Sequence, residues 1–571
     1  MRAALRLETR PPRLWTEFEV YFLVLVALGI YFSRLTTLTI RGEESRRARV
    51  AQEMLDSGDW IVERQQGEIF ADRPPLGEWA IAAATLLNGG QMTTATIRLP
   101  AVTATLLTGL LLYFYARSFM TRAGAFGTGV AYLTFGQVLQ IGRLAESEAI
   151  FILLLGAAML VWHAGYVGRW RPWLMWSAGY ALAAFSGLTK GPQGPVYFCA
   201  AIGLYLLVRR DWRCLLSGSH LLGLCVFAAI FLVWLVPYYL RTNYQAARDS
   251  LLGVSLVRFG GTTPLWQHMA SYPLQILACL LPWSPLFVRY FDRSFWAGLG
   301  NARPHVIFGF TAIAATFPSV WFASEALNRH YMGLYPCFAL LAGVVIDRCL
   351  ASDVGSLLRR RWNWYLGGMS VVMLAIGVVV CGAGFIPGEI AGRVAQAVPF
   401  VVLFAIGVLA AVGVSWWSIR SLHSRGGELG LLAVAAFLGL SYTGIMINIQ
   451  ANISEDSAAA VAKVKGNLPP GTQLVSLGRL DHVFTFHYRD AIPVVPWPQT
   501  ANALPDDAEY FCFSPEGSPA GELPFAWEKI AVVSCDRNHL PEPQRTVVIG
   551  RRLDTATART QQLAEPTKRF E

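Results

Sequence analysis

The chain has 571 residues, of which 54% are hydrophobic and only 15% are charged, and its mean hydropathy is +0.42. Soluble domains hold about 25% charged residues, and apolar runs of about 17–23 residues recur here, so the composition excludes a soluble globular fold and predicts a polytopic α-helical membrane protein. The formal net charge of +10 comes mostly from loop arginines, which report orientation in a membrane rather than a nucleic-acid partner.

The first apolar run follows a short arginine-bearing N-terminus and is too long for the core of a cleaved signal peptide. We therefore expect a retained first span. In all, thirteen apolar segments have about the length that a membrane span needs. They cover residues 18–36, 97–116, 124–141, 149–165, 172–188, 192–208, 217–239, 273–291, 304–323, 331–350, 363–385, 398–419 and 428–449.

A fourteenth apolar segment, residues 76–90, is shorter and carries Glu78 near its start. Counting it as a span would reverse the side of every later loop. If it does not cross and the N-terminus is inside, every loop assigned to the cytoplasm carries arginine, as the positive-inside rule requires. These loop residues include Arg117, Arg122, Arg169, Arg171, Arg209, Arg210, Arg213, Arg289, Arg293, Arg303, Arg348, Arg359, Arg360, Arg361, Arg420 and Arg425. The sequence therefore predicts thirteen transmembrane helices, an in-plane helix at 76–90 and a C-terminus outside.

The composition changes at residue 452, which predicts a transmembrane module at 1–451 and a soluble domain at 452–571. The tail holds a helical stretch at 454–465 and then short apolar segments separated by Pro and Gly turns. These segments are 473–476, 483–487, 510–513, 530–534 and 546–549. The alternation predicts a small α/β or mostly β domain. Its two cysteines, Cys512 and Cys535, would lie in an oxidising compartment, where a disulfide is one alternative and free thiols the other.

The stretch 41–49 follows the first span and contains two adjacent carboxylates and four arginines. Charge this dense beside hydrocarbon is costly unless the groups pair or serve a polar site. With thirteen spans, the other polar clusters on the same outer side are 56–73, 143–148, Lys190, 241–268 and 329–330. Together they supply carboxylates for acid–base work, cations that could bind a phosphate, and interfacial tryptophans.

Each cluster also has a structural interpretation. Glu148 could pair with Arg143, Lys190 could extend from a helix end toward water, and the 329–330 pair could cap a helix. A lone His268 in a loop is more often a surface residue than a ligand. Their common side of the membrane favours a site for an anionic lipid or a polyprenyl phosphate.

Several motifs occur in a fixed order over residues 18–340. They read Glu43-Glu44-Ser45-Arg46-Arg47-Ala48, Gln52-Glu53-Met54-Leu55, Gly58-Asp59-Trp60 with Gly67, Asp72-Arg73-Pro74-Pro75-Leu76, Arg143 with Glu148, Thr189-Lys190-Gly191-Pro192, Leu281-Pro282-Trp283-Ser284, and Asn328-Arg329-His330-Tyr331 before Tyr335-Pro336. This set resembles the GT-C glycosyltransferases that use polyprenyl-phosphate sugars. The match is to the protein O-mannosyltransferase type, and most closely to the bacterial lipid A aminoarabinose transferases.

The resemblance implies an inner-membrane enzyme with its site on the periplasmic face, where a monosaccharide leaves undecaprenyl phosphate with inversion. Glu43 and Glu148 fall on the family's carboxylate positions, so they are the implied catalytic residues. The implied donor- and phosphate-binding residues are Arg46, Asp72, Arg73, Lys190, Arg329 and Tyr331. No cofactor is required. A divalent metal is an alternative, with Asp72 and His268 as candidate ligands, although their spacing forms no recognisable site.

The sequence departs from the family pattern at four positions. The family has Asp where this chain has Glu43 and Glu148, Lys where it has Arg73, and Tyr where it has Arg47. Glutamate keeps the charge and adds one methylene, so the exchange is compatible with activity, with a different acceptor, or with loss of catalysis.

Three alternatives to transfer onto a glycolipid stay open at this stage. The acceptor could be a protein hydroxyl, the chain could be a lipid transporter without chemistry, or it could be a catalytically silent binding protein. Against a transporter stand the absence of internal repeats and the predicted outer domain.

Overall fold

The computed structural model describes residues 17–40, 42–253, 258–260, 263–353, 355–383, 398–421, 426–453, 456–500, 508–515, 523–535 and 545–553. The chain divides into two compact units. We call Met1–Leu35, Ala71–Gly77 and Arg98–Ile447 the helical unit, and Thr36–Phe70, Glu78–Ile97 and Asn448–Glu571 the α/β unit.

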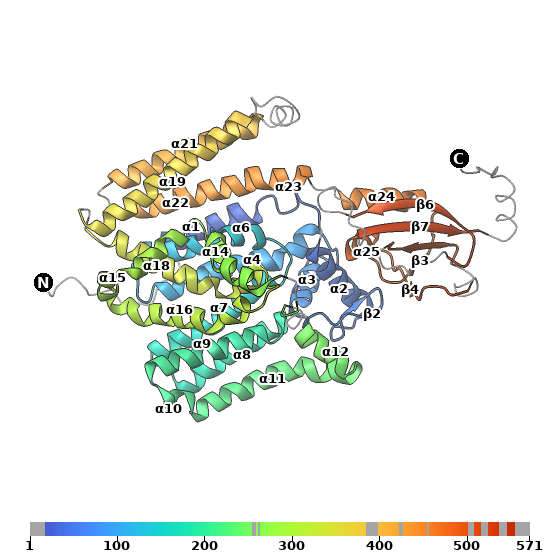
Figure 1. Ribbon diagram of the computed structural model, residues 1–571, viewed down its shortest axis with the longest axis horizontal. Coiled ribbons are helices and arrows are strands. Elements are labelled where there is room, and N and C mark those ends of the chain that lie inside the picture. The colour runs from blue at the N-terminus through green and yellow to red at the C-terminus, as the bar shows by residue number, and fades with distance from the viewer. Residues whose placement is uncertain are drawn as a thin grey trace. The chain divides into compact units, whose positions relative to one another are not determined.

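The helical unit is built from apolar helices (Figure 1). Its elements, including those that continue into the other unit, are α1 (Phe18–Ala27), η2 (Leu28–Phe32), α4 (Thr94–Ala116), α5 (Arg122–Leu133), α6 (Gly136–Ile141), α7 (Glu148–Val167), α8 (Pro172–Lys190), α9 (Gln193–Arg209), α10 (Trp212–Leu215), α11 (Gly218–Arg241), α12 (Tyr244–Arg248), η3 (Asp249–Gly253), α14 (Leu265–Cys279), η4 (Ser284–Phe291), α15 (Arg293–Ala297), η5 (Gly300–Ala302), α16 (Arg303–Thr316), α17 (Pro318–Trp321), η6 (Asn328–Leu334), α18 (Tyr335–Leu350), α19 (Leu357–Gly382), α21 (Val398–Arg420), α22 (Gly426–Leu440), η8 (Ser441–Met446) and α23 (Ile447–Ile453).

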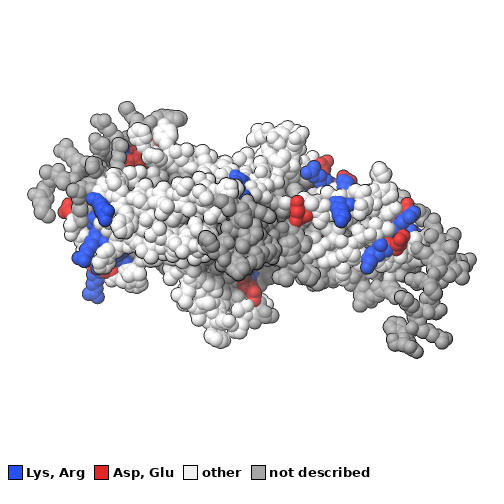
Figure 2. Space-filling model, turned by 90° about the horizontal axis from the view of Figure 1, so that it is seen from above, with Lys and Arg blue, Asp and Glu red and all other residues white. Residues whose placement is uncertain are grey.

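Small residues let these helices approach closely. On α18, a Cβ at Gly343 would lie 1.8 Å from Thr128 Oγ1 of α5, so the two helices touch through backbone at this point. Further neighbours are α7 with α8, α8 with α11, α9 with α16, and α19 with α21. Figure 2 shows a broad surface of the helical unit with few charged side chains, as contact with lipid requires.

Seven described helices are long and apolar enough to cross a membrane, or eight if α14 and η4, which meet at 112°, form one broken span. The seven are Thr94–Ala116, Glu148–Val167, Gly218–Arg241, Asn328–Leu350, Leu357–Gly382, Pro399–Arg420 and Gly426–Ala451. The chain is thus a polytopic helical membrane protein, as predicted. The count of thirteen spans stays a prediction, because other predicted segments form shorter or broken helices.

The breaks have local causes. The predicted span 273–291 divides between α14 and η4, where Pro282 and Pro285 supply no backbone N–H to an α-helical ladder. The predicted span 124–141 divides into α5 and α6 at Thr134 and Phe135. The segment predicted to lie in the membrane plane forms α3 (Leu76–Leu87), whose 12 residues span only about 18 Å.

The α/β unit contains α2 (Glu43–Ser57), the hairpin β1 (Arg64–Gln65) and β2 (Glu68–Ile69), most of α3, and the described part of the tail. The tail elements are α24 (Ser457–Asn467), β3 (Leu474–Leu477), α25 (His482–Tyr488), β4 (Val494–Val495), β5 (Tyr510–Phe513), β6 (Trp527–Ser534) and β7 (Thr546–Arg552). The strands form one mixed sheet in the order β4-β3-β5-β7-β6 (Figure 1). β3 is parallel to β4 and β5, whereas β7 is antiparallel to β5 and β6.

Helices and strands of the tail share one apolar core. Val461 of α24, Phe484 of α25 and Val547 of β7 are buried together in it. The apolar segment 483–487 lies in the helix α25, and Asp481 caps the first turn of this helix by accepting a hydrogen bond from Val483 N. Cys512 and Cys535 lie in the same core and are not joined by the disulfide that the sequence left open.

The packing around Gly550 of β7 generates a prediction. A Cβ at this position would lie 2.6 Å from Phe511 and 2.7 Å from Trp527. Gly550→Ala should therefore overpack the sheet and lower the free energy of unfolding by about 1–3 kcal/mol. Hydrogen exchange of β5–β7 in the full-length protein should accelerate on the order of ten-fold or more. The control is Gly466→Ala on α24, where a Cβ meets nothing within 4 Å and exchange should be unchanged or slower. Equal exchange in the two variants would contradict this account.

Candidate active site

A buried ion pair lies at one end of α7 and α8. Glu148 is the first residue of α7 and Lys190 the last of α8, and the two helices pack together, joined by a short turn. Lys190 Nζ lies 2.8 Å from Glu148 Oε1, and the side chains are only 4% and 5% exposed. A carboxylate at a helix N-terminus and an ammonium at a helix C-terminus both complement the helix dipoles. Gly191 ends α8 at φ +71, where an added Cβ would lie 2.9 Å from Leu251 O.

The Glu148–Lys190 pair rules out two structural alternatives that the sequence left open for these residues. Glu148 pairs with Lys190 rather than with Arg143, whose Nη2 donates to the carbonyl oxygens of Arg34 at 2.7 Å and Ser33 at 3.3 Å. Lys190 is buried and does not extend toward water. Its Nζ also lies 5.4 Å from the centre of the Phe151 ring.

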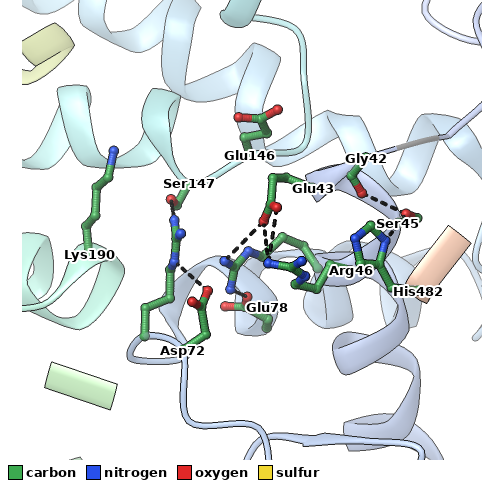
Figure 3. Close-up of polar contacts among 12 residues, drawn as sticks. Gly42, Glu43, Ser45, Arg46, Asp72, Glu78, Glu146, Ser147, Lys190 and His482 are labelled. Carbon is green, nitrogen blue, oxygen red and sulfur yellow. Dashed lines mark hydrogen bonds and ion pairs between the residues drawn. The ribbon is translucent and has the colours of Figure 1, made fainter. Parts of the chain in front are cut away.

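Three consecutive residues before and at the start of α7 each hold a cation from a different segment. Glu146 Oε2 accepts from Arg329 Nη1 of η6 at 2.8 Å, Ser147 Oγ accepts from Arg73 Nη1 at 2.7 Å, and Glu148 holds Lys190. Arg73 also pairs with its neighbour Asp72, Nε to Oδ2, at 3.0 Å. We call Arg73, Lys190 and Arg329, together with the residues 146–148 that hold them, the cation cluster. Figure 3 labels Asp72, Glu146, Ser147 and Lys190 of this region.

A fourth cation, Arg258, belongs to the same region. It interacts electrostatically with Arg73 and Glu148, and its Nη1 donates to Gln193 Oε1 at 3.3 Å. Burial lowers the pKa of Arg258, which marks a charged group held partly away from water. Counting Asp72, Glu146 and Glu148 against the four cations leaves an excess of positive charge. The arrangement is therefore suited to an anion such as a phosphate.

The sequence predicted Arg73, Lys190 and Arg329 as one group, and the structure brings all three to residues 146–148. It did not predict Glu146, Ser147, Gln193 or Arg258. Glu146 and Ser147 lie directly before Glu148, so the polar run 146–148 was a usable signal. Arg258 lies within the predicted polar cluster 241–268, but no motif distinguished it from its neighbours.

Other predicted site residues have structural partners. Tyr331 is fully buried, and its hydroxyl lies 3.1 Å from both Ile313 O and Thr316 Oγ1. His268 Nε2 lies 3.0 Å from Val320 O. The His330 ring accepts from Leu327 N at 3.1 Å, which is the helix cap that the sequence offered as an alternative. In the part of the chain that the structure describes, no three His, Cys, Asp or Glu side chains form a metal-binding group.

Glu43 lies in the α/β unit, in the first turn of α2. This helix has a glycine cap at each end, Gly42 with φ +58 and Gly58 with φ +71. The Glu43 side chain is 24% exposed and pairs with Arg46 Nη1 at 3.1 Å and Arg47 Nη2 at 3.7 Å. Figure 3 shows these contacts of Glu43.

A second ion pair anchors this turn. Arg47 Nη1 lies 2.6 Å from Glu78 Oε1 of α3, and both side chains are only 2% exposed. The Arg46 guanidinium lies 5.8 Å from the centre of the Phe70 ring. Glu43 is thus a partly exposed carboxylate held between two arginines. Arg47, one of the four residues that depart from the pattern of the resembling family, connects α2 to α3 through Glu78.

Comparisons with known proteins agree on one type of membrane enzyme. The model of the dolichyl-phosphate-mannose-protein mannosyltransferase family matches residues 72–236. An undecaprenyl phosphate-alpha-4-amino-4-deoxy-L-arabinose arabinosyl transferase from Pseudomonas aeruginosa (strain UCBPP-PA14) is 27% identical over 423 residues, 70% of this chain and 71% of the relative. The enzyme of the same name from Edwardsiella ictaluri is 27% identical over 354 residues, 58% of this chain and 61% of the relative.

The fold is shared with a solved structure. The crystal structure of ArnT from Cupriavidus metallidurans bound to undecaprenyl phosphate has a TM-score of 0.65, at 20% identity, and the match covers 94% of this chain and 98% of the other. The apo structure of the same protein gives a TM-score of 0.67.

The burial of Glu148 and Lys190 predicts how the pair responds to substitution. Lys190→Met leaves the buried carboxylate of Glu148 without its ion-pair partner and should destabilise the protein by about 3–5 kcal/mol, whereas adding Glu148→Gln should restore much of that loss. Thermal unfolding in detergent measures both variants. Arg122→Gln is the control, since Arg122 is half-exposed and lies 3.7 Å from its partner Glu17. If Lys190→Met alone is as stable as the native chain, Glu148 and Lys190 are not electrostatically coupled.

Proposed function

We infer that this chain, a polyprenyl-phosphate-dependent glycosyltransferase of the GT-C, aminoarabinose transferase type, moves a monosaccharide from undecaprenyl phosphate to a lipid A-like glycolipid. The transfer inverts the anomeric carbon and occurs on the periplasmic face of the inner membrane. The names of the relatives and the shared fold support the donor and the acceptor class. The observation that carries the proposal is the cation cluster.

The cation cluster would stabilise the leaving group. When the sugar departs, negative charge grows on the phosphate of the lipid carrier. Arg73, Lys190 and Arg329 come from three separate segments but are held by three consecutive residues, so their geometry is fixed before the substrate binds. Preorganised cations in a site with little water stabilise such charge most effectively, and guanidinium groups match phosphate oxygens in pairs. Glu148 keeps Lys190 oriented and charged.

The donor's lipid tail needs an apolar surface within the helical unit. A groove of about 520 Å³ is lined almost entirely by apolar side chains of α6, the α14–η4 break, α19 and α22. Its lining includes Leu281, Tyr365, Met369, Val372 and Phe437. We assign this groove to a stretch of the polyprenyl chain, whose hydrocarbon it could bury.

Glu43 would act on the acceptor. A partly exposed carboxylate can accept a proton from, or orient, the attacking hydroxyl or phosphate. If the attacking group is a phosphate of the glycolipid, it is already an anion and Glu43 needs only to position it. Asp72 and Arg46 are the remaining polar residues of the proposed site. Tyr331 would support the site by packing.

A protein hydroxyl is the second candidate acceptor, because the matching family model describes protein mannosyltransferases. A divalent metal is the remaining option at Asp72 and His268. It would have to displace the contacts of Asp72 with Arg73 and of His268 with the Val320 carbonyl.

The proposal includes the predicted topology of thirteen spans, with the C-terminal residues outside and α3 in the membrane plane. A periplasmic reporter fused after residue 455 should be active and a cytoplasmic one inactive, and a reporter fused after residue 95 should also report the periplasm. The arginine-rich inner loops are the physical reason. A cytoplasmic result at residue 455 would remove the outer-face assignment.

Arg329→Ala tests whether the cation cluster stabilises the leaving phosphate. Losing a charge-assisted contact to phosphate costs about 1.5–3 kcal/mol, so release of undecaprenyl phosphate from a labelled undecaprenyl phosphate-4-amino-4-deoxy-L-arabinose donor should fall roughly ten- to a hundred-fold. Mass spectrometry of the acceptor separates lipid A from protein. The control is Arg122→Ala, which removes an arginine outside the cation cluster and should leave the rate unchanged. If the native chain binds the donor but releases no carrier phosphate from any undecaprenyl-phosphate monosaccharide, the chain is a binding protein or transporter.

A further inference from the structure

The short helix α25 of the tail contacts the chain on both sides of the turn that leads into α2. His482 Nδ1 lies 2.8 Å from Ser45 Oγ, and His487 Nε2 lies 3.0 Å from the carbonyl oxygen of Ile40. All of these residues belong to the α/β unit, and α2 and α25 pack against each other. Figure 3 shows Ser45 close to both Gly42 and His482.

The hydrogen bonds run in one direction. Ser45 Oγ donates to Gly42 O at 2.7 Å, and Ser45 N donates to the same oxygen at 3.1 Å. A serine hydroxyl has a single hydrogen, so His482 must supply the hydrogen between Nδ1 and Oγ. The contact therefore selects the imidazole form that carries its proton on Nδ1, and it orients Ser45 toward Gly42.

Gly42 needs this support. Its φ of +58 and ψ of −140 lie in a backbone region that glycine alone adopts readily, and Glu43 follows directly. Residues in the first turn of a helix have unsatisfied N–H groups and fray easily. A shift of the Gly42 carbonyl would turn the Glu43 side chain with it.

The remaining contacts do not replace this one. Arg46 and Arg47 hold the Glu43 carboxylate, and Arg47 also anchors α2 to Glu78, whereas Ser45 acts on the Gly42 carbonyl itself. Arg49 Nη1 contacts the carbonyl oxygen of Arg489 at 3.3 Å, beyond the other end of α25 and further along α2. Among the residues that the structure describes, the side-chain support for Gly42 O comes from Ser45, and through Ser45 from His482.

We propose that His482 is a positioning residue for Glu43, which it aligns through Ser45 and the Gly42 carbonyl. The proposal rests on the proposed function, since it needs Glu43 to act on the acceptor. It gives the tail a part in the reaction, because the imidazole comes from residues more than 400 positions along the chain from the carboxylate that it aligns.

The test compares two substitutions of one side chain. His482→Ala removes the donor and should lower kcat for sugar transfer on the order of ten-fold, because displacements well under 1 Å already slow positioned groups. Apparent KM for undecaprenyl phosphate-4-amino-4-deoxy-L-arabinose should not change. His482→Asn keeps an N–H donor near the place of Nδ1 and should recover most of the rate. A purely structural role would be seen instead as faster hydrogen exchange of α25 and β3.

A double-mutant cycle tests the path. Ser45→Ala should lower kcat as much as His482→Ala, and the double variant should be no worse than either, because both break one chain of contacts. Additive losses would overturn the path through Ser45. The control is Arg479→Ala, which removes another long-range contact of the tail, the exposed pair with Glu68, and should leave kcat unchanged.

Glu43→Gln provides the reference. Transfer should nearly vanish in this variant, since loss of a positioned acid–base group costs about 10²–10⁴-fold. If Glu43→Gln is inactive while His482→Ala keeps the native kcat, the positioning role is refuted and the proposed function stands. If Glu43→Gln keeps full activity, the assignment of Glu43 fails and the positioning role fails with it.

Discussion

The cost of burying charge governs the helical unit. Glu148 and Lys190 are both more than nine-tenths buried, and each stabilises the charge of the other. Their pairing fixes the start of α7 and the end of α8, and residues 146–148 thereby become a rigid edge. Arg73 and Arg329 reach this edge from segments distant in sequence. One desolvated ion pair thus determines where the neighbouring cations lie, and the same cations provide the positive surface that a phosphate would need.

Much of this could be predicted from the sequence, because charge is costly near hydrocarbon. The loop arginines predicted one side of the membrane for the polar clusters, and the structure brings Arg73, Lys190 and Arg329 to residues 146–148. Their partners could not be predicted. Arg143 is five residues from Glu148, but its guanidinium binds backbone carbonyls at residues 33 and 34, a choice that depends on how the first helix ends. Arg258 belongs to no motif, so its hydrogen bond to Gln193 could not be predicted.

The fold shows a similar division. The strands β5 and β7 fall where apolar runs indicated them, whereas α25 formed a helix because an aspartate caps it. Helix breaks at Pro282 and at Thr134 shortened two predicted spans. Grouping of residues 36–70 with the tail could not be seen in the sequence, because the contacts join segments that are far apart along the chain. The predicted boundary at 451/452 describes the change of composition but not this long-range association.

That association has a consequence for biogenesis. The ribosome makes α2 and its glutamates early, whereas α25 is completed only after residue 488. At a synthesis rate of about 5–20 residues per second, the first loop would wait on the order of 20–80 s for its partner helix. During that interval Ser45 and Ile40 lack the imidazoles that contact them in the finished protein. Until translation is nearly finished, the first turn of α2 should therefore lack the support that α25 gives it in the complete chain.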